Sequence, residues 1–442
     1  MKRLLIVVVA ALATVAGAVH AQGLANNRVC LLGDSRLAYD FINSSTAPGG
    51  AIVHNAKGIG YWWEALSGGR VRVLFADGLA GPGYSSGDII SKGALDKAVV
   101  APCATVLLLA STNDTHALGK SASSSILNLQ TIIDRLVQAK KRVVAITELP
   151  RGNAASPDQR FTPGERAQHM KVRAWLAATA PTTFGPLYVP VDAYADWLDP
   201  DSVTGDVLAT PGLTEADGLH PGTTGAFRIG MRLANDPAVM APYPAIDATA
   251  SRPQGQDLLP DAGMADPPIP APSGQVAAGW AFSVNGGEGL KVVTALAADP
   301  PGTRRQTITV RGNAGTGAPM VFFSQNLDYD MLKPGDRLDA GGRFEIAPNC
   351  RGMQDFGMIL FRLTDTGKGV FEVQTGTGGQ GPLPTQSAPI SGVWRLAAGD
   401  RYTTVSGAEK IVQVAVAAHA VPGWRGVSCT LTFTDMWARK LP

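Results

Sequence analysis

Hydrophobic and polar positions follow two different patterns along the chain, and the change falls near residue 245. Before it, apolar runs at 29–32, 104–109, 142–147 and 188–191 predict short strands of the kind that a parallel sheet buries on both faces. Between Ser124 and Lys140, apolar residues recur at offsets of three and four, which predicts one face of an amphipathic helix. This alternation of strand and helix predicts an α/β domain in which helices cover both faces of a parallel sheet.

After residue 245 the pattern changes. Residues 246–275 are rich in Pro, Ala, Asp and Gly, a composition that suits a linker or an extended lead-in. Beyond them no helical face is visible, and runs with strand character recur at 307–310, 320–323, 358–361, 370–373, 411–414 and 429–433. Many short strands separated by turn signals predict that residues 276–442 form an all-β, jelly-roll-like sandwich.

The first 21 residues have the layout of a secretory signal peptide. Two basic residues precede an apolar run from Leu4 to about Val15, and small residues then lead to Val19-His20-Ala21, a cleavage site of the A-x-A type. We therefore expect a secreted or periplasmic protein whose α/β domain occupies residues 22–245. The alternative is an uncleaved N-terminal anchor. No later segment approaches about 18 uninterrupted apolar residues, so we expect no membrane span.

Composition narrows the classes of function. The 442 residues are 45% hydrophobic and 17% charged and include 51 Gly and 31 Pro, which excludes a coiled coil and a disordered chain. A formal net charge of +2 offers no electrostatic basis for binding nucleic acid. Of the four cysteines, Cys350 and Cys429 are the better candidates for a disulfide. Cys30 and Cys103 lie in or beside apolar runs, where buried thiols are the alternative, and no spacing resembles a zinc site.

Candidate catalytic residues follow the predicted strands. Gly33-Asp34-Ser35 comes directly after the first strand, at the edge where open α/β sheets place their ligands. Asn113 follows the strand at 104–109, and its amide could donate a hydrogen bond to a developing oxyanion. Asp217 precedes His220 by three residues. That spacing lets the carboxylate hold one imidazole nitrogen while the other accepts a serine proton.

Together these motifs resemble the four sequence blocks of the SGNH (GDSL-type) hydrolase superfamily, over about residues 27–235. The resemblance implies that Ser35 is the nucleophile and that Asp217 and His220 complete a catalytic triad. It also implies an oxyanion hole formed by the N–H groups of Ser35 and Gly87 and the amide of Asn113, with Gly83 as the alternative to Gly87.

Three residues depart from the pattern of this superfamily. Arg36 replaces the usual Leu after the serine, Ser111 replaces the Gly two residues before the Asn, and Ile89 replaces the Thr or Ser that often follows the second-block glycine. We expect Ser111 to crowd the oxyanion hole slightly and Arg36 to add a cation beside the nucleophile. None of the three removes a catalytic group.

The other histidines and aromatic residues allow a functional and a structural interpretation, and the structural one is favoured for each. They could line the site or bind a sugar, but buried aromatic clusters commonly fill cores and isolated loop histidines commonly lie at the surface. The residues concerned are His54, His116, His169, His419, Tyr61, Trp62, Trp63, Trp280, Trp394, Trp424 and Trp437.

The resemblance implies two-step acyl transfer that needs neither a metal nor an organic cofactor. We expect a secreted serine esterase that removes acyl groups, with acetyl as the first candidate, from a carbohydrate. The carbohydrate is inferred because the appended sandwich resembles a carbohydrate-binding module. Two alternatives remain: a lipase-like esterase or thioesterase for short acyl chains, and a non-catalytic glycan-binding envelope protein. The oligomeric state stays open.

Overall fold

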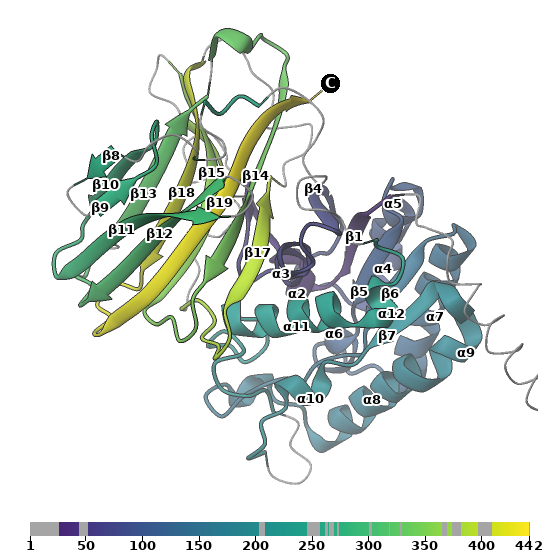
Figure 1. The fold of residues 1–442 in the computed structure, drawn as a ribbon. Coiled ribbons are helices and arrows are strands. Elements are labelled where there is room, and N and C mark those ends of the chain that lie inside the picture. The colour runs from purple at the N-terminus through teal and green to yellow at the C-terminus, as the bar shows by residue number, and fades with distance from the viewer. Residues whose placement is uncertain are drawn as a thin grey trace, which may run out of the picture.

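Figure 1 shows the computed structural model, in which an α/β body lies beside a β-sandwich. The structure describes residues 26–441, except 44–51, 203–207, 245–256, 261–263, 265–268, 272–273, 300–302, 318, 328, 365–368, 374–381 and 397–408. The predicted signal peptide at 1–21 and most of the segment 246–275 lie outside these described residues.

A parallel sheet forms the centre of the α/β body, with the strand order β4-β1-β5-β6-β7. Its strands are β1 (Arg28–Gly33), β4 (Arg72–Gly78), β5 (Thr105–Leu109), β6 (Arg142–Ile146) and β7 (Tyr188–Val191). The structure confirms the four strands that the apolar runs predict and adds β4. The edge strand β4 is only partly buried, so it lacks the continuous apolar run that reveals the others.

Helices cover both faces of this sheet, as the α/β prediction requires. The predicted helix at 124–140 is α7 (Ala122–Gln138). The others are α2 (Ser35–Ala38), α3 (Ile59–Leu66), α4 (Ser86–Ser91), α5 (Ala94–Val100), α6 (Thr112–Thr115), α8 (Pro163–Ala174), α9 (Ala180–Phe184), α10 (Tyr194–Trp197), α11 (Thr223–Asn235) and α12 (Pro237–Met240). Alternate residues of β1 reach opposite faces: Val29 and Leu31 share a core with α3 and α11, and Leu32 shares one with α4, α5 and α7.

Two seven-stranded sheets make up the sandwich in the described part of the chain. One has the order β10-β13-β18-β15-β16-β3-β2 and the other β17-β14-β19-β12-β11-β9-β8. The strands are β8 (Ile269–Ala271), β9 (Gly274–Val276), β10 (Ala281–Asn285), β11 (Leu290–Asp299), β12 (Thr303–Gly312), β13 (Met320–Asn326), β14 (Arg337–Ile346), β15 (Met353–Thr364), β16 (Gly369–Val373), β17 (Ile390–Arg395), β18 (Glu409–Ala420) and β19 (Val427–Leu441).

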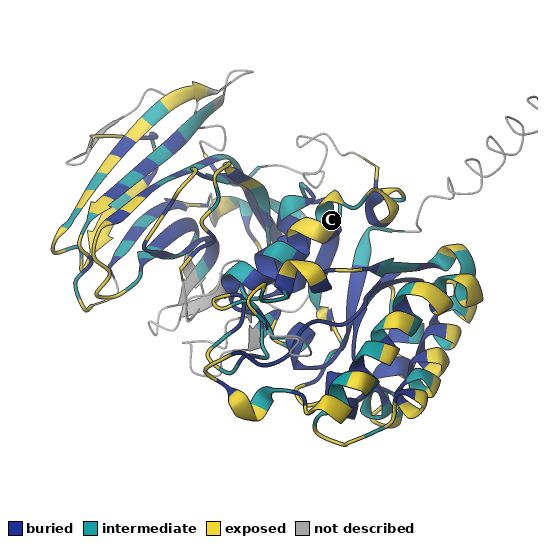
Figure 2. Cartoon of the chain, turned by 90° about the horizontal axis from the view of Figure 1, so that it is seen from below, coloured by how far each residue is buried: buried dark blue, intermediate teal, exposed yellow. Residues whose placement is uncertain are grey.

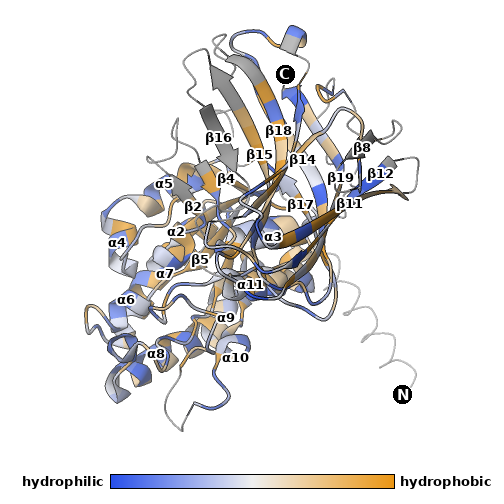
Figure 3. Cartoon of the chain, turned by 90° about the vertical axis from the view of Figure 1, so that its left-hand side faces the viewer, coloured by the Kyte–Doolittle hydropathy of each residue, from blue (hydrophilic) through white to orange (hydrophobic). Residues whose placement is uncertain are grey.

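Buried and exposed residues alternate along several sandwich strands, as expected where one face of a sheet meets the core (Figure 2). Apolar residues are concentrated along β15 and β18 in the middle of their sheet (Figure 3). The strand β8 and the first two residues of β9 lie within the segment that the composition predicts to be a linker, so part of that segment belongs to the edge of a sheet.

The α/β body and the sandwich share one sheet. The strands β2 (Phe41–Asn43) and β3 (Ile52–His54) come from the N-terminal half, and β3 pairs in parallel with β16 of the sandwich. At a second junction, the guanidinium of Arg72 donates to the Leu396 carbonyl at 2.6 Å. The position of the sandwich is therefore set by backbone pairing as well as by side-chain packing.

Each half of the chain contains one disulfide, Cys30–Cys103 in the α/β body and Cys350–Cys429 in the sandwich. The first bond excludes the buried thiols that the apolar surroundings of Cys30 and Cys103 left open. None of the helices in the described part of the chain combines the length and hydrophobicity that a membrane crossing requires.

Candidate active site

The residue that the sequence singles out as a nucleophile, Ser35, opens α2 at the carboxyl end of β1. Gly33 ends β1 where the chain passes close to β5, and a Cβ there would lie 2.1 Å from the Leu109 carbonyl oxygen. Asp34 caps α2, because its Oδ1 accepts the Arg36 N–H at 2.9 Å. The tripeptide thus turns the chain sharply from strand to helix and presents the Ser35 hydroxyl at the edge of the sheet.

His220 meets this hydroxyl from a loop 185 residues further along the chain. Its Nε2 lies 2.8 Å from Ser35 Oγ, and its Nδ1 lies 2.5 Å from Asp217 Oδ2. The loop is held by backbone bonds from Glu215 N–H to the His220 carbonyl and from Gly218 N–H to the Glu215 carbonyl. The structure therefore brings Ser35, His220 and Asp217 into one hydrogen-bonded row.

The environment of Asp217 favours its ionised form. Partial burial acts to raise the pKa of Asp217, but hydrogen bonds from the Leu219 N–H, the His220 ring and the His220 N–H outweigh it and hold that pKa below its ordinary value. The two backbone bonds to Asp217 Oδ1 measure 2.9 Å and 3.1 Å. An ionised Asp217 can orient the imidazole and stabilise its positive form.

Asn113 lies in α6, directly after the strand β5. Its Nδ2 donates one hydrogen bond to the Tyr84 carbonyl at 3.0 Å, and no acceptor among the described residues takes its second hydrogen. The backbone N–H of Ser35 likewise has no acceptor in the described part of the chain. Two donors of the kind that an oxyanion hole requires are therefore unused near the serine.

Two glycines near the start of α4, Gly87 and the alternative Gly83, are candidates for the third oxyanion donor. Gly87 is the second residue of α4, and a Cβ there would lie 3.3 Å from Lys120 Nζ and 3.6 Å from Asn128 Nδ2. Gly83 has a φ of +72° and follows Pro82, which lines the pocket next to His220.

The expectation for Arg36 is wrong, because its guanidinium turns inward instead of adding a cation to the site. It is 2% exposed, binds Asp34 Oδ2 at 2.7 Å and binds Glu148 Oε2 at 2.9 Å. Burial acts to lower the pKa of Arg36, but the two carboxylates outweigh it and hold that pKa above its ordinary value. Burial raises the pKa of Glu148. Arg36 is therefore paired with two buried carboxylates and is not available to the site.

Ser111 joins the same buried network. Its hydroxyl donates to Glu148 Oε1 at 2.8 Å, and its φ of +113° lies in the region that favours glycine. This hydrogen bond directs the Ser111 side chain toward Glu148, so the side chain does not crowd the oxyanion donors described above.

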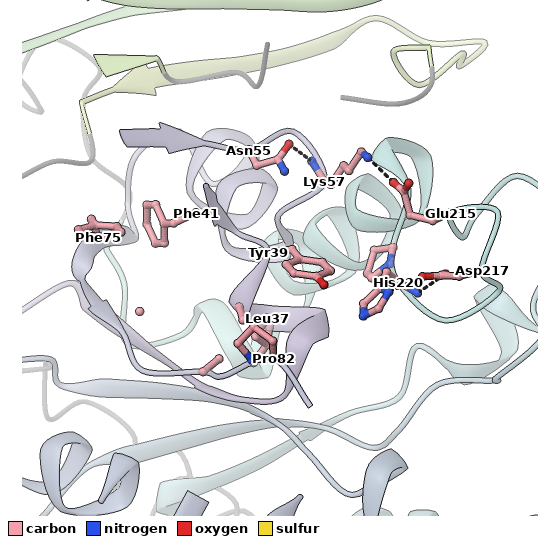
Figure 4. Close-up of a pocket in the computed structure, with 14 residues that line it drawn as sticks. Leu37, Tyr39, Phe41, Asn55, Lys57, Phe75, Pro82, Glu215, Asp217 and His220 are labelled. Atoms are coloured by element: carbon pink, nitrogen blue, oxygen red, sulfur yellow. Dashed lines mark hydrogen bonds and ion pairs between the residues drawn. The ribbon is translucent and has the colours of Figure 1, made fainter. Parts of the chain in front are cut away.

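A pocket of about 630 Å³ is lined at one end by Asp217 and by His220, the residue whose ring bonds Ser35 (Figure 4). Tyr39 forms a wall, with its ring centred 4.7 Å from the His220 ring. Lys57 Nζ pairs with Glu215 Oε1 at 2.5 Å at the same end. Sequence reasoning missed Tyr39, Lys57 and Glu215. Tyr39 is close in sequence to Ser35 and Glu215 is close to Asp217, which could have indicated that both lie near the site. Lys57 offered no such signal.

The structural interpretation holds for most of the remaining candidates. The following residues are buried, as the structural interpretation expects: Tyr61, Trp62, Trp63, Trp280, Trp394, Trp437, His54 and His169. Trp424 is the exposed exception among the sandwich tryptophans named above. His116 lies 3.6 Å from Glu165 and does not line the pocket. His419 has a partner that the sequence did not reveal, since its Nδ1 lies 2.6 Å from Asp355 Oδ1.

In the described residues, no group of three or more His, Cys, Asp or Glu side chains is placed to hold a metal ion. No family model matches the chain, and no curated protein matches it by sequence.

Solved structures do resemble parts of the chain. A member of the lipolytic protein G-D-S-L family from Veillonella parvula DSM 2008 is 15% identical, with a TM-score of 0.33, and the match covers 46% of this chain and 94% of that one. A carbohydrate esterase family 3 protein from Talaromyces cellulolyticus is 17% identical, with a TM-score of 0.31, covering 47% of this chain and 94% of that one.

A third match is a structure of carbohydrate-binding modules from the beta-sandwich superfamily. It is 13% identical, with a TM-score of 0.25, and covers 37% of this chain and 58% of that one. Since every identity is below 20% and every TM-score below 0.4, the functional argument rests on the geometry of the site.

Proposed function

We propose that the protein is a serine hydrolase of carboxylic esters, in which Ser35, His220 and Asp217 act as nucleophile, base and orienting acid. The observation that carries this proposal is the 2.8 Å separation of Ser35 Oγ and His220 Nε2, with Asp217 on the other imidazole nitrogen. An imidazole in this position can take the serine proton at the moment of attack.

The reaction proceeds in two steps. Ser35 Oγ attacks the ester carbonyl carbon as its proton passes to His220 Nε2, and the carbonyl electron pair moves onto oxygen. The oxyanion collapses to an acyl-enzyme, and the departing alcohol takes the proton from His220. Water then attacks the acyl carbon with His220 again as base, and the carboxylic acid leaves as Ser35 recovers its proton.

The oxyanion hole in this proposal consists of the Ser35 N–H, the second Asn113 amide hydrogen and the Gly83 N–H. Gly83 is chosen over Gly87 in this proposal because it adjoins Pro82, which lines the pocket, and Tyr84, whose carbonyl holds the Asn113 amide. Donors fixed in advance by such bonds need no rearrangement when charge develops on the substrate oxygen.

Hydrolysis of p-nitrophenyl acetate by the wild type and by Ser35→Ala tests the proposed chemistry. Loss of at least a thousandfold in kcat, on the order of what removal of a nucleophile costs, is expected in the mutant. Equal rates in the two proteins would refute the ester hydrolase. Circular dichroism of both proteins controls for unfolding.

For the biological substrate, we propose an acylated carbohydrate met outside the cytoplasm. The expected signal peptide and the sandwich support this assignment, and the sequence suggests acetyl as the acyl group. Acid release from acetylated polysaccharides, compared with release from short lipid esters, tests it. Exclusive release from the lipid esters would favour the alternative, a short-chain esterase.

We also propose that the sandwich binds glycans. The full-length Ser35→Ala protein is suitable for affinity electrophoresis on polysaccharides, since a fragment beginning near residue 250 would lack β3, the strand that pairs with β16. Retardation by a polysaccharide supports binding, and migration unchanged by every polysaccharide of the panel leaves the sandwich a structural domain.

A further inference from the structure

The pocket beside Ser35 has one apolar and one polar end. Figure 4 shows Phe41 and Phe75 at one end, His220 with Glu215 and Lys57 at the other, and Tyr39 between them. An ester has two sides, an acyl group and an alcohol, and the two ends of the pocket differ enough to assign one to each.

Protein atoms hold the apolar end open and rigid. The Phe41 and Phe75 rings meet edge to face with centroids 5.6 Å apart, and Phe41 stacks on the buried His54 ring at 4.6 Å. Gly78 has no side chain to fill this end. A Cβ at that position would lie 3.3 Å from the Phe41 ring. Leu37, Ala80 and Pro82 add further apolar surface to the pocket. A ligand that covers this surface gains free energy in proportion to its apolar area.

The polar end belongs to the loop that carries the catalytic base. Glu215 pairs with Lys57, and its backbone N–H donates to the His220 carbonyl at 2.8 Å. The leaving alcohol takes its proton from His220, so it must lie at this end. Hydroxyl groups of a carbohydrate can exchange hydrogen bonds with Lys57, Glu215 and Asn55, whereas an alkyl chain would desolvate them without compensation.

We infer that the apolar end binds the acyl group of the substrate and that this group is substantially longer than the acetyl group that the sequence suggests, which it replaces in the proposed substrate. This inference rests on the proposed esterase. The pocket, with both ends together, has about 630 Å³, room for on the order of twenty water-sized groups at ~30 Å³ each and far more than one methyl group fills. An acetyl group places one methyl beyond the carbonyl and leaves the Phe41 and Phe75 surfaces uncovered. A linear acyl chain of about six to eight carbons, or an aromatic acid, covers them.

Two series of esters test the inference with the wild-type protein. In the first, p-nitrophenyl esters from acetate to octanoate vary only the acyl chain, and kcat/KM is expected to rise by about fourfold per buried methylene until the pocket is filled. In the second, acetate esters of alcohols of increasing length vary only the leaving group, and no comparable rise is expected. A highest kcat/KM for p-nitrophenyl acetate, or a rise confined to the alcohol series, overturns the inference.

Variants locate the effect in the pocket. Ala80→Phe places a ring in the apolar end and should lower the ratio of kcat/KM for hexanoate to that for acetate by tenfold or more. Ala297→Phe introduces the same side chain on an exposed position of β11, far along the sandwich, and should leave the ratio unchanged. Phe75→Ala, which creates space, should move the preferred chain length upward. Ratios unchanged in both pocket variants would overturn the inference.

The two proposals fail in distinguishable ways. If no ester is cleaved faster by the wild type than by Ser35→Ala, the proposed function fails and the inference with it. If p-nitrophenyl acetate is cleaved through Ser35 but longer acyl chains are not preferred, the esterase stands and only the acyl assignment is overturned.

Discussion

Replacing Arg36 by Leu, the residue usual in the superfamily that the motifs resemble, should strongly destabilise this protein. The guanidinium is buried between Asp34 Oδ2 at 2.7 Å and Glu148 Oε2 at 2.9 Å, and both carboxylates are 0% exposed. Arg36→Leu removes the cation that is hydrogen-bonded to these two carboxylates, while the charge of Arg151 still acts on both. Removing one partner of a buried ion pair typically costs about 3–5 kcal/mol. That is a large part of a total stability of about 5–15 kcal/mol.

The loss should depend on pH, and the sign follows from Glu148. Burial already raises the pKa of Glu148 with Arg36 present, and without the cation that pKa rises further. A carboxyl group whose pKa is higher in the folded protein binds more protons there than in the unfolded chain. Stability therefore falls as pH rises above the ordinary value of 4.5, and the deficit of Arg36→Leu is larger at pH 8 than at pH 5.

Urea unfolding of the wild type and Arg36→Leu at pH 5 and pH 8, followed by circular dichroism, measures the effect. Arg135→Leu is a matched control, because its pair with Asp96 is exposed and should contribute no more than about 1 kcal/mol. Adding Glu148→Gln to Arg36→Leu removes one uncompensated charge and should restore part of the stability. A deficit below about 1 kcal/mol, or one equal at both pH values, would refute the reasoning.

Three further predictions concern the rest of the molecule. Asn113→Ala should lower kcat by about 10²–10³-fold with an unchanged circular dichroism spectrum, and near-normal turnover would exclude Asn113 from the oxyanion hole. Replacing both Cys30 and Cys103 by Ala should lower the free energy of unfolding, measured in urea, by about 4 kcal/mol, because the disulfide closes a loop over 73 residues and restricts the unfolded chain. An unchanged urea midpoint would show that the bond contributes nothing. Burial opposes the charged form of His419, but Asp355 outweighs it and raises the pKa of His419 above 6.5, so stability should fall as pH rises from about 6.5. Asp355→Asn should flatten that fall, and an identical pH profile would contradict it.

The local sequence determined the elements of the α/β body. Continuous apolar runs are sufficient for β1, β5, β6 and β7, because strands buried on both faces must be apolar throughout. Gly33-Asp34-Ser35 could be recognised for a similar reason, because the turn from strand to helix depends on interactions between residues that are adjacent in sequence. Asp217 and His220 are three residues apart, and their contact is a property of one loop.

Contacts between distant segments were decided only by the tertiary structure. From the sequence, an arginine next to the serine is expected to place a cation in the site. In the fold its guanidinium instead binds the buried Glu148, which is 112 residues away. The contact between the Asn113 amide and the Tyr84 carbonyl joins residues 29 positions apart, and spacing gave no sign of it. The pairing of β3 with β16 joins segments about 320 residues apart, beyond the reach of any local pattern.

The pocket shows the same division. The sequence supplies Tyr39, Phe41 and Phe75 as ordinary hydrophobic residues, which most often fill a core. Whether their rings are covered depends on what the fold packs against them, and here an open space remains beside Ser35. The sequence by itself thus determined the kind of chemistry at the site. The acyl group that this chemistry acts on depends on a cavity that exists only once β1, β4 and the His220 loop have come together.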